Sequence, residues 1–254
     1  RSGRVLLRIE DHDRLRSRRE FEEAILEDLD WLGFEPDEPM VRQSDRSAIY
    51  EGALERLRKR GLVYACSCTR SDVARAFQVR AAAELRYPGT CRERGLTESP
   101  GLGLRVRLEP SVERFVDLRL GSQEQRPSEQ CGDLLVRDRE GHWTYQFAAT
   151  VDDLMQGVTL VIRGVDLLDS TGRQIQLARL LGRADPPAFF HHPLIMKSSA
   201  FAKGVGGTGP PSAEGFGAPR QKLSKSDGDT GIRELRARGW TPEQVIDAAL
   251  AAVR

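Results

Sequence analysis

Alternating blocks of apolar and polar positions predict a strand and then a helix at the start of the chain. Residues 5–9 form an apolar run, which predicts a buried strand. Apolar residues at helical spacing follow over 21–32, after a capping box formed by Ser17 and Glu20. Gly33 suits the left-handed position that ends many helices.

The same alternation continues to residue 65. A polar, proline-rich segment over 34–46 predicts a loop, and a second helix is expected over 47–60, closed by Gly61. A short strand over 62–65 follows. The order strand, helix, helix, strand favours an α/β fold with a parallel sheet that helices cover on both faces.

The middle of the chain changes character. A predicted helix over 71–86 and a Tyr-Pro-Gly turn at 87–89 come before a β-rich stretch over 103–150. Within that stretch, residues 133–137 and 143–148 are interpreted as the two strands of a hairpin.

The α/β alternation returns toward the C-terminus. The expected elements are a strand over 158–162, a helix over 172–182, a strand near 189–195 and a last helix with Thr241 as N-cap, Pro242 at N1 and Gln244 at N3. Residues 198–219 hold six glycines and three prolines, which predicts a flexible insertion.

Length and charge narrow the class of protein without identifying it. The 254 residues fit one large domain or two small ones. Lys and Arg number 39 and Asp and Glu 38, so the net charge of +1 excludes a polybasic protein but allows a local basic face. No apolar run approaches the roughly 18 residues of a membrane span, and the first residues resemble no signal peptide. We therefore expect a cytoplasmic protein with no membrane partner, whose four cysteines are free or bind metal.

Lysine is rare, and its placement is informative. Five lysines stand against 34 arginines, a bias that codon usage in a GC-rich genome explains. Two of the five, Lys222 and Lys225, fall in the segment KLSKS at 222–226. Two ammonium groups at this spacing can clamp a polyphosphate, although a solvated basic turn is the alternative.

Three cysteines lie close together in the sequence. Cys66, Cys68 and Cys91 bracket a short segment between the two α/β parts, which is typical of a small zinc knuckle. A tetrahedral zinc site needs a fourth ligand, which this spacing leaves open among Cys131, a histidine and an oxygen donor. Three buried, reduced thiols are the alternative, since cysteine packs as a small apolar residue.

Polar residues at strand ends suggest a ligand site. Glu10 follows the first predicted strand, where ligands gather in open α/β sheets, and its carboxylate can hold an ammonium group. Arg163 leaves a later strand and can bind a carboxylate through its planar fork. Tyr145 lies upstream in the segment WTYQFA. The alternatives are a polar strand exit and a surface arginine.

Taken together, these segments resemble the glutamyl-tRNA synthetase group of class I aminoacyl-tRNA synthetases. KLSKS is similar to the KMSKS loop of that class. The segments RIEDHDRLRS, LDWLGF, RQSDR, WTYQFAATVDDLMQGVTLVIRGVDLLDSTGRQ and KLSKS follow the order found in the group, over about residues 4–235. This resemblance implies a Rossmann-type doubly wound parallel sheet with a small zinc-binding insert and C-terminal helices.

The resemblance also implies a domain organisation. Residues 1–65 are the first part of the catalytic core, 66–130 a zinc-binding mixed α/β insert, 131–235 the second part with the KLSKS loop, and 236–254 a C-terminal helix. The family begins with a further strand and an H-x-G-H motif that bind adenine and phosphates. His12, His142, His191 and His192 all lie in other contexts, so we expect that segment to be missing from this sequence.

Within the group, the short chain resembles the glutamyl-Q tRNA(Asp) synthetase subfamily. That subfamily activates L-glutamate with ATP and Mg²⁺ and transfers it to the queuosine base in the anticodon of tRNA(Asp), and a monomer is expected. The alternatives are a truncated catalytic core of an ordinary glutamyl-tRNA synthetase and a catalytically dead tRNA-binding paralogue.

The resemblance assigns roles to individual residues. It implies that Glu10 holds the substrate ammonium group, that Arg163 binds the side-chain carboxylate and that Tyr145 positions the substrate. Lys225, with Lys222 beside it, is expected to bind the phosphates of ATP and to act in catalysis. The metal ligands carried over from the family are Cys66, Cys68, Tyr87 and Cys91.

Overall fold

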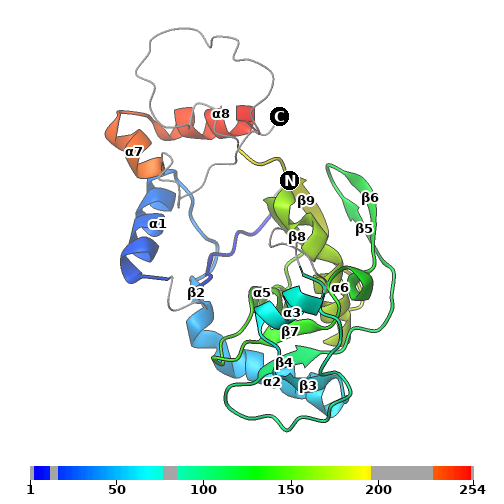
Figure 1. Cartoon of the computed structure of the whole chain (residues 1–254). Coiled ribbons are helices and arrows are strands. Elements are labelled where there is room, and N and C mark those ends of the chain that lie inside the picture. The colour runs from blue at the N-terminus through cyan, green and yellow to red at the C-terminus, as the bar shows by residue number, and fades with distance from the viewer. Residues whose placement is uncertain (1–2, 12–16, 77–84, 196–230, 253–254) are drawn as a thin grey trace.

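Short strands alternate with helices along the chain (Figure 1). The computed structural model describes residues 3–11, 17–76, 85–195 and 231–252. Its helices are α1 (Arg19–Trp31), α2 (Ser47–Lys59), α3 (Arg70–Ala76), α4 (Pro127–Gln130), α5 (Tyr145–Met155), α6 (Thr171–Leu180), α7 (Ile232–Ala237) and α8 (Pro242–Ala252), with 3-10 turns at Gln43–Arg46 and Val165–Ser170. Its strands are β1 (Arg8–Ile9), β2 (Val41–Arg42), β3 (Val63–Cys66), β4 (Gly103–Val106), β5 (Glu113–Asp117), β6 (Gly121–Gln125), β7 (Leu134–Arg137), β8 (Leu160–Gly164) and β9 (Ala188–His192).

The chain is α/β, as the pattern predicts, and three strand pairs are parallel. β1 pairs with β2, and β9 pairs with both β8 and β5. The described strands nevertheless form three separate sheets rather than one parallel sheet: β1-β2 is parallel, β3-β4-β7 is antiparallel, and β6-β5-β9-β8 is mixed. β3, expected to continue the parallel alternation, instead pairs antiparallel with β4 in the sheet β3-β4-β7.

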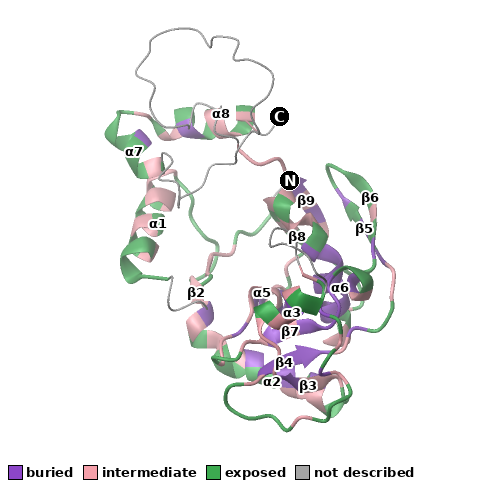
Figure 2. Cartoon of the chain, in the orientation of Figure 1, coloured by how far each residue is buried: buried purple, intermediate pink, exposed green. Residues whose placement is uncertain are grey.

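The largest core lies between α2, α5 and the sheet β3-β4-β7. Tyr50, Leu54 and Leu57 of α2 are fully buried, since their spacing places them on one helical face. They pack with Phe147 of α5, and Trp143 contacts both the Tyr50 and Phe147 rings. Figure 2 shows buried residues in these elements, and further ones along α6 and β9.

Helix α6 covers one face of the sheet β6-β5-β9-β8. Phe115, Phe189 and Ile175 form its core, and strand alternation sends Val116 and Ile162 to the opposite face, where they are 60% and 64% exposed. The same alternation determines which polar side chains of neighbouring strands point toward α6, and those side chains lie close to one another.

The predicted hairpin is wrong in its second strand. Residues 143–148 form no strand beside β7: Trp143 makes an isolated bridge to Arg137, the Thr144 backbone N–H donates to the Val136 carbonyl at 3.0 Å, and α5 begins at Tyr145. Phe147, Ala148 and Val151 are buried along this helix. Contact with α2 therefore decided between strand and helix for a short apolar run that fits either.

The first helix also differs from its prediction. α1 ends near Gly33 as expected, at a φ of 75°, but its N-cap is Arg18 and no side chain caps it, so the Ser17 capping box does not form. Phe21 is 54% exposed, and among the described residues α1 packs at its C-terminal end, where Trp31 meets the cluster of Leu235 in α7 and Val245 in α8.

Other helical predictions hold where the structure describes them. α2 covers the range predicted, and α3 covers the start of the helix expected over 71–86, most of whose remainder lies outside the described residues. At α8, the Gln244 backbone N–H donates to the Thr241 hydroxyl at 3.3 Å, and the Gln244 side-chain oxygen Oε1 accepts from the Thr241 backbone N–H at 2.9 Å. These two bonds form the predicted cap. No helix in the described segments is long and apolar enough to cross a membrane.

Candidate functional site

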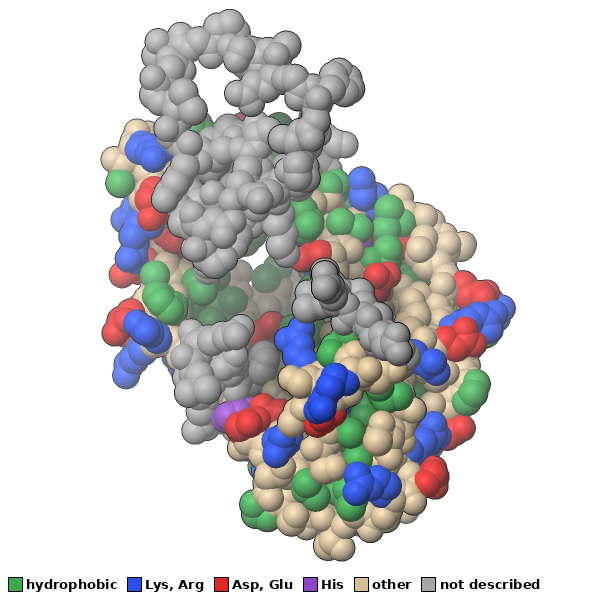
Figure 3. Space-filling model, viewed as in Figure 1, with side chains coloured by type: hydrophobic (Ala, Val, Ile, Leu, Met, Phe, Trp, Pro, Cys, Tyr) green, Lys and Arg blue, Asp and Glu red, His purple; other side chains and the backbone are tan. Residues whose placement is uncertain are grey.

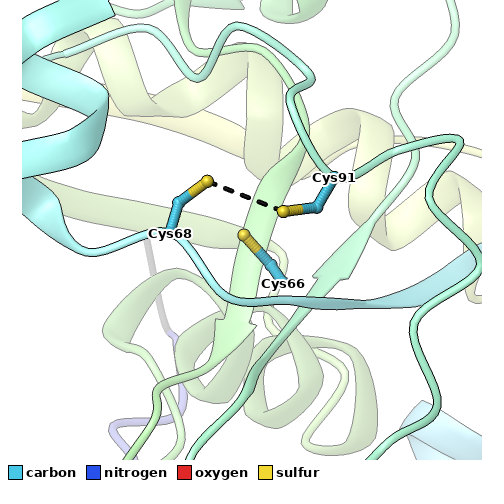
Figure 4. Close-up of side chains that lie close together, drawn as sticks. All are labelled: Cys66, Cys68 and Cys91. Atoms are coloured by element: carbon cyan, nitrogen blue, oxygen red, sulfur yellow. Dashed lines mark hydrogen bonds between the residues drawn. The ribbon is translucent and has the colours of Figure 1, made fainter.

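Three thiols meet where β3 ends. Cys66 is the last residue of β3, Cys68 follows it on the next loop, and Cys91 comes from the loop after residue 85. Their sulfur atoms all lie within 4.8 Å of one another, and Cys68 Sγ is 3.6 Å from Cys91 Sγ. Figure 4 shows the three side chains pointing toward a common centre.

The Tyr87 hydroxyl lies against the same cluster. It accepts hydrogen bonds from the Cys66 thiol at 3.4 Å and from the Cys91 backbone N–H at 2.8 Å. Cys131, one of the candidates for a fourth ligand, belongs to the large core instead, and its thiol donates to the carbonyls of Pro127 and Gly132. Among the described residues, Tyr87 is therefore the candidate oxygen donor beside the thiols.

The donor set fits a tetrahedral zinc ion. A Zn–S bond of about 2.3 Å places two sulfur ligands about 3.8 Å apart, and a sulfur and an oxygen ligand about 3.5 Å apart. The Cys68–Cys91 and Cys66–Tyr87 distances of 3.6 Å and 3.4 Å lie close to these values.

Nearby groups set the charge of the cluster. Arg105 stacks on the Tyr87 ring with its guanidinium carbon 3.6 Å from the ring centre, and its Nε–H donates to Cys66 Sγ at 3.3 Å. Burial raises the pKa of Cys68 to about 11. Burial acts in the same direction on Cys91, but hydrogen bonds involving Ser67, Cys68 and Tyr87 outweigh it and lower its pKa to about 6. The cationic Arg105 suits a cluster that becomes anionic on binding a metal.

A second group of residues gathers around the carboxyl end of β8. The Arg163 guanidinium donates to Gln174 at 2.6 Å, Thr171 at 2.7 Å and His191 at 3.0 Å. Tyr145, the first residue of α5, interacts with the same guanidinium and electrostatically with the Glu10 carboxylate. Burial and the Glu10 carboxylate raise the pKa of Tyr145, so its hydroxyl keeps its proton at neutral pH.

The structure thus brings Glu10, Tyr145 and Arg163 into one neighbourhood. Lys222 and Lys225, with the whole KLSKS segment and the 198–219 insertion, lie outside the described residues.

Comparison with known proteins identifies the family. Residues 1–201 match the model of the tRNA synthetases class I (E and Q), catalytic domain. The protein is 38% identical over 250 residues to a glutamyl-Q tRNA(Asp) synthetase of Pseudomonas fluorescens, covering 98% of this chain and 78% of that protein. It is 41% identical over 248 residues to one of Bordetella bronchiseptica, covering 96% and 76%. The chain belongs to the class I tRNA synthetase family.

The fold agrees with this class I synthetase membership. The structure matches a glutamate tRNA ligase from Elizabethkingia meningosepticum, solved in complex with its amino acid, with a TM-score of 0.71 at 26% identity. The match covers 96% of this chain and 53% of that one, so the chain spans about half the length of that ligase. The resemblance read from the ordered motifs is confirmed, and the protein is a class I aminoacyl-tRNA synthetase-like ligase.

Sequence reasoning missed the residues that support this synthetase site. Asp152 of α5 is fully buried and accepts hydrogen bonds from Gln43 at 2.9 Å, Arg46 at 2.7 Å and Tyr50 at 2.8 Å. Arg8 beside it donates to Asp153 at 2.9 Å. The adjacent acidic pair in the sequence was a signal of this network, but its arginine partners come from elements more than 100 residues away.

Proposed function

We propose that this class I synthetase activates L-glutamate with ATP and transfers the glutamyl group to queuosine in the anticodon of tRNA(Asp). The observation that carries the proposal is the convergence of Glu10, Tyr145 and Arg163. A carboxylate, a hydroxyl and a guanidinium match the ammonium, polar and carboxylate groups of glutamate. The relatives named glutamyl-Q tRNA(Asp) synthetase support the choice of acceptor.

Each side chain then has a role that its chemistry allows. Glu10 holds the substrate ammonium group, and Arg163 binds the side-chain carboxylate by two parallel hydrogen bonds. Tyr145 donates a hydrogen bond that orients the substrate, since its raised pKa keeps the phenol protonated. Positioning the glutamate α-carboxylate for attack on the α-phosphate supplies much of the rate enhancement.

The remaining steps fall to the KLSKS segment and the nucleotide. Lys222 and Lys225 bind the phosphates of ATP, which enters with Mg²⁺, and stabilise the charge that develops as pyrophosphate leaves. The tRNA then accepts the activated glutamyl group. ATP and a modified tRNA as substrates fit a cytoplasmic monomer. On the face drawn in Figure 3, the basic and acidic side chains of the described residues are interspersed.

We also propose one structural zinc ion held by Cys66, Cys68, Tyr87 and Cys91. The mutual distances of these donors and the contact of Arg105 with Cys66 support it. The ion would fix the loops that carry Cys68 and Cys91 against β3, and it takes no part in adenylate chemistry.

Acceptor and activation assays test the function. With labelled glutamate and ATP, label should reach tRNA(Asp) that carries queuosine and should not reach queuosine-free tRNA(Asp). K225A should lower glutamate-dependent ATP–pyrophosphate exchange by roughly two orders of magnitude or more, the scale of losing one charge-stabilising group. K59M, at an exposed position on α2, is the control.

Three outcomes contradict the proposal. Label on the 3′ end of tRNA(Glu) would identify an ordinary glutamyl-tRNA synthetase core. Binding of tRNA(Asp) without any exchange activity would identify a non-catalytic paralogue. Near-normal ATP–pyrophosphate exchange by K225A would show that Lys225 does not belong to the active site.

A further inference from the structure

Asp117, His191 and Arg163 form a continuous chain of hydrogen bonds across three adjacent strands. They lie at the carboxyl ends of β5, β9 and β8, and Arg163 stands directly opposite His191 in the parallel register. The His191 side chain is 0% exposed, and its Nδ1 is 2.7 Å from Asp117 Oδ2. Its Nε2 is 3.0 Å from Arg163 Nε.

These contacts determine where the imidazole carries its proton. Arg163 Nε is always a donor, so His191 Nε2 must accept. The proton of a neutral imidazole then sits on Nδ1 and is donated to Asp117. Asp117 is itself oriented as an acceptor, because its carboxylate also receives the backbone N–H groups of Arg119, Leu120 and His191 at 3.0, 2.8 and 3.0 Å.

The other contacts of Arg163 complete a rigid seat for its guanidinium. Thr171 and Gln174 of α6 accept from Nη2 and Nη1, and the Phe189 ring lies 5.6 Å from the guanidinium carbon. Among the described contacts named here, His191 is the one that changes from acceptor to donor when it takes up a proton. Protonation of His191 at acidic pH would therefore weaken the contacts that hold the Arg163 guanidinium in place.

We propose that His191, held by Asp117 as the Nδ1–H tautomer, is a positioning residue that orients Arg163 for the substrate carboxylate. This inference rests on the proposed role of Arg163 in glutamate binding. A neutral His191 fixes the guanidinium plane, whereas a protonated His191 places a second cation against it and removes the acceptor of its Nε–H.

Four described groups face His191, and they act on its protonation in different directions. They are Asp117 from β5, Arg163 from β8, Thr171 from α6 and His192, its neighbour on β9. Burial lowers the pKa of His191, Asp117 opposes this, and Arg163 and His192 lower it further. Because the net effect lowers the pKa of His191, the folded protein binds this proton only at pH values under the ordinary histidine value of about 6.5, and glutamate affinity should weaken there.

Two amide substitutions separate the functions of the two imidazole nitrogens. In H191Q, the longer side chain can place an oxygen near the Nε2 position and still accept from Arg163. In H191N, the shorter amide can replace Nδ1 toward Asp117 but leaves the Arg163 Nε–H without its acceptor. We expect the Kd for L-glutamate, measured by calorimetry at pH 7.5 on the full chain, to rise about tenfold in H191N and less than about threefold in H191Q.

The pH dependence of the Kd distinguishes a positioning role of His191 from a merely structural role, which would not change it. The Kd of the wild type should rise as the pH is lowered from about 6.5, the Kd of H191Q should rise less, and H192Q should keep the wild-type dependence. If H191Q keeps the wild-type pH profile, the inference is overturned. This test can still be made if H191N fails to fold. R163K separates the two proposals. If R163K binds glutamate normally, the proposed function fails at this residue, whereas a weakened R163K beside an unchanged H191N overturns the positioning role alone.

Discussion

The Tyr87 hydroxyl adds an oxygen atom to the cluster of three thiols, which buried cysteines alone would not provide. This hydroxyl accepts from Cys66 and from the Cys91 backbone, and Arg105 covers the Tyr87 ring. A phenol has an ordinary pKa near 10, and burial raises that of Tyr87 further. A divalent cation is the group that would favour its ionised form, as it does for coordinating thiols.

Replacing one thiol of the cluster should remove the metal, whereas replacing the remaining cysteine should not. C91S should hold well under one zinc per chain, because only two thiols and Tyr87 remain. C131S should keep about one zinc, since the Cys131 thiol contacts backbone carbonyls in a different core. Elemental analysis of protein purified without chelator measures both. A wild-type protein without zinc would identify the cysteines as ordinary buried thiols.

At the scale of elements, a glycine sets how closely the Tyr87 loop approaches β7. The Tyr87 N–H donates to the Cys131 carbonyl at 2.8 Å, just before Gly132, whose φ is 68°. A Cβ on Gly132 would lie 2.1 Å from the Tyr87 carbonyl oxygen, much closer than a Cβ contact allows. The absence of a side chain there lets the loop that carries Tyr87 dock on the sheet β3-β4-β7.

Gly132→Ala should therefore destabilise the protein more than an alanine at a glycine with free space. Gly121 is the matched control, because its φ is 76° and nothing lies within 4 Å of its would-be Cβ. We expect G121A to cost about 1 kcal/mol, the penalty of the left-handed conformation, and G132A several times as much because of the added clash. Urea denaturation measures the difference. Equal losses would mean that the loop moves away from Gly132 freely.

At the scale of the whole molecule, three strands bring their polar ends together on the face that α6 covers. β5, β9 and β8 are far apart in sequence, yet parallel pairing places Asp117, His191 and Arg163 side by side. Buried titratable groups in such a network couple the stability of the fold to pH.

Acidification should lower the free energy of unfolding. The pKa of His191 is lowered mainly by burial, so the unfolded state binds its proton first, and this contribution declines as the pH falls below about 6.5. Burial alone would raise the pKa of Asp117, but hydrogen bonds from His191 and backbone N–H groups lower it, which adds a loss of the same sign at lower pH. Asp153, whose pKa burial raises, acts in the opposite direction.

The contribution of His191 is isolated by comparing the wild type with H191Q. Chemical denaturation from pH 7.5 to 5 should give a steeper decline in the wild type, because only that protein carries the titrating imidazole. Parallel declines in the two proteins would contradict the pH dependence assigned to His191.

The sequence predicted elements well where a local pattern was strong. Helix α2 followed from apolar residues at helical spacing closed by Gly61, and the α8 cap from Thr241 and Gln244. Predictions failed where contacts between distant segments decide. Residues 145–148 form the start of α5, which packs against α2, and Ser17 caps no helix because α1 begins one residue later than its pattern required.

The order of the motifs by itself determined that the protein is an α/β class I synthetase, and spacing singled out Cys66, Cys68, Cys91 and the strand-end residues. Only the tertiary structure decided which distant side chains meet. It placed Tyr87, which the family resemblance had already named, beside the thiols and Cys131 in the large core, and it set His191 between Asp117 and Arg163. The physical reason is that helical and strand periods depend on neighbouring residues, whereas pairing between strands and the docking of loops join residues that the sequence separates widely.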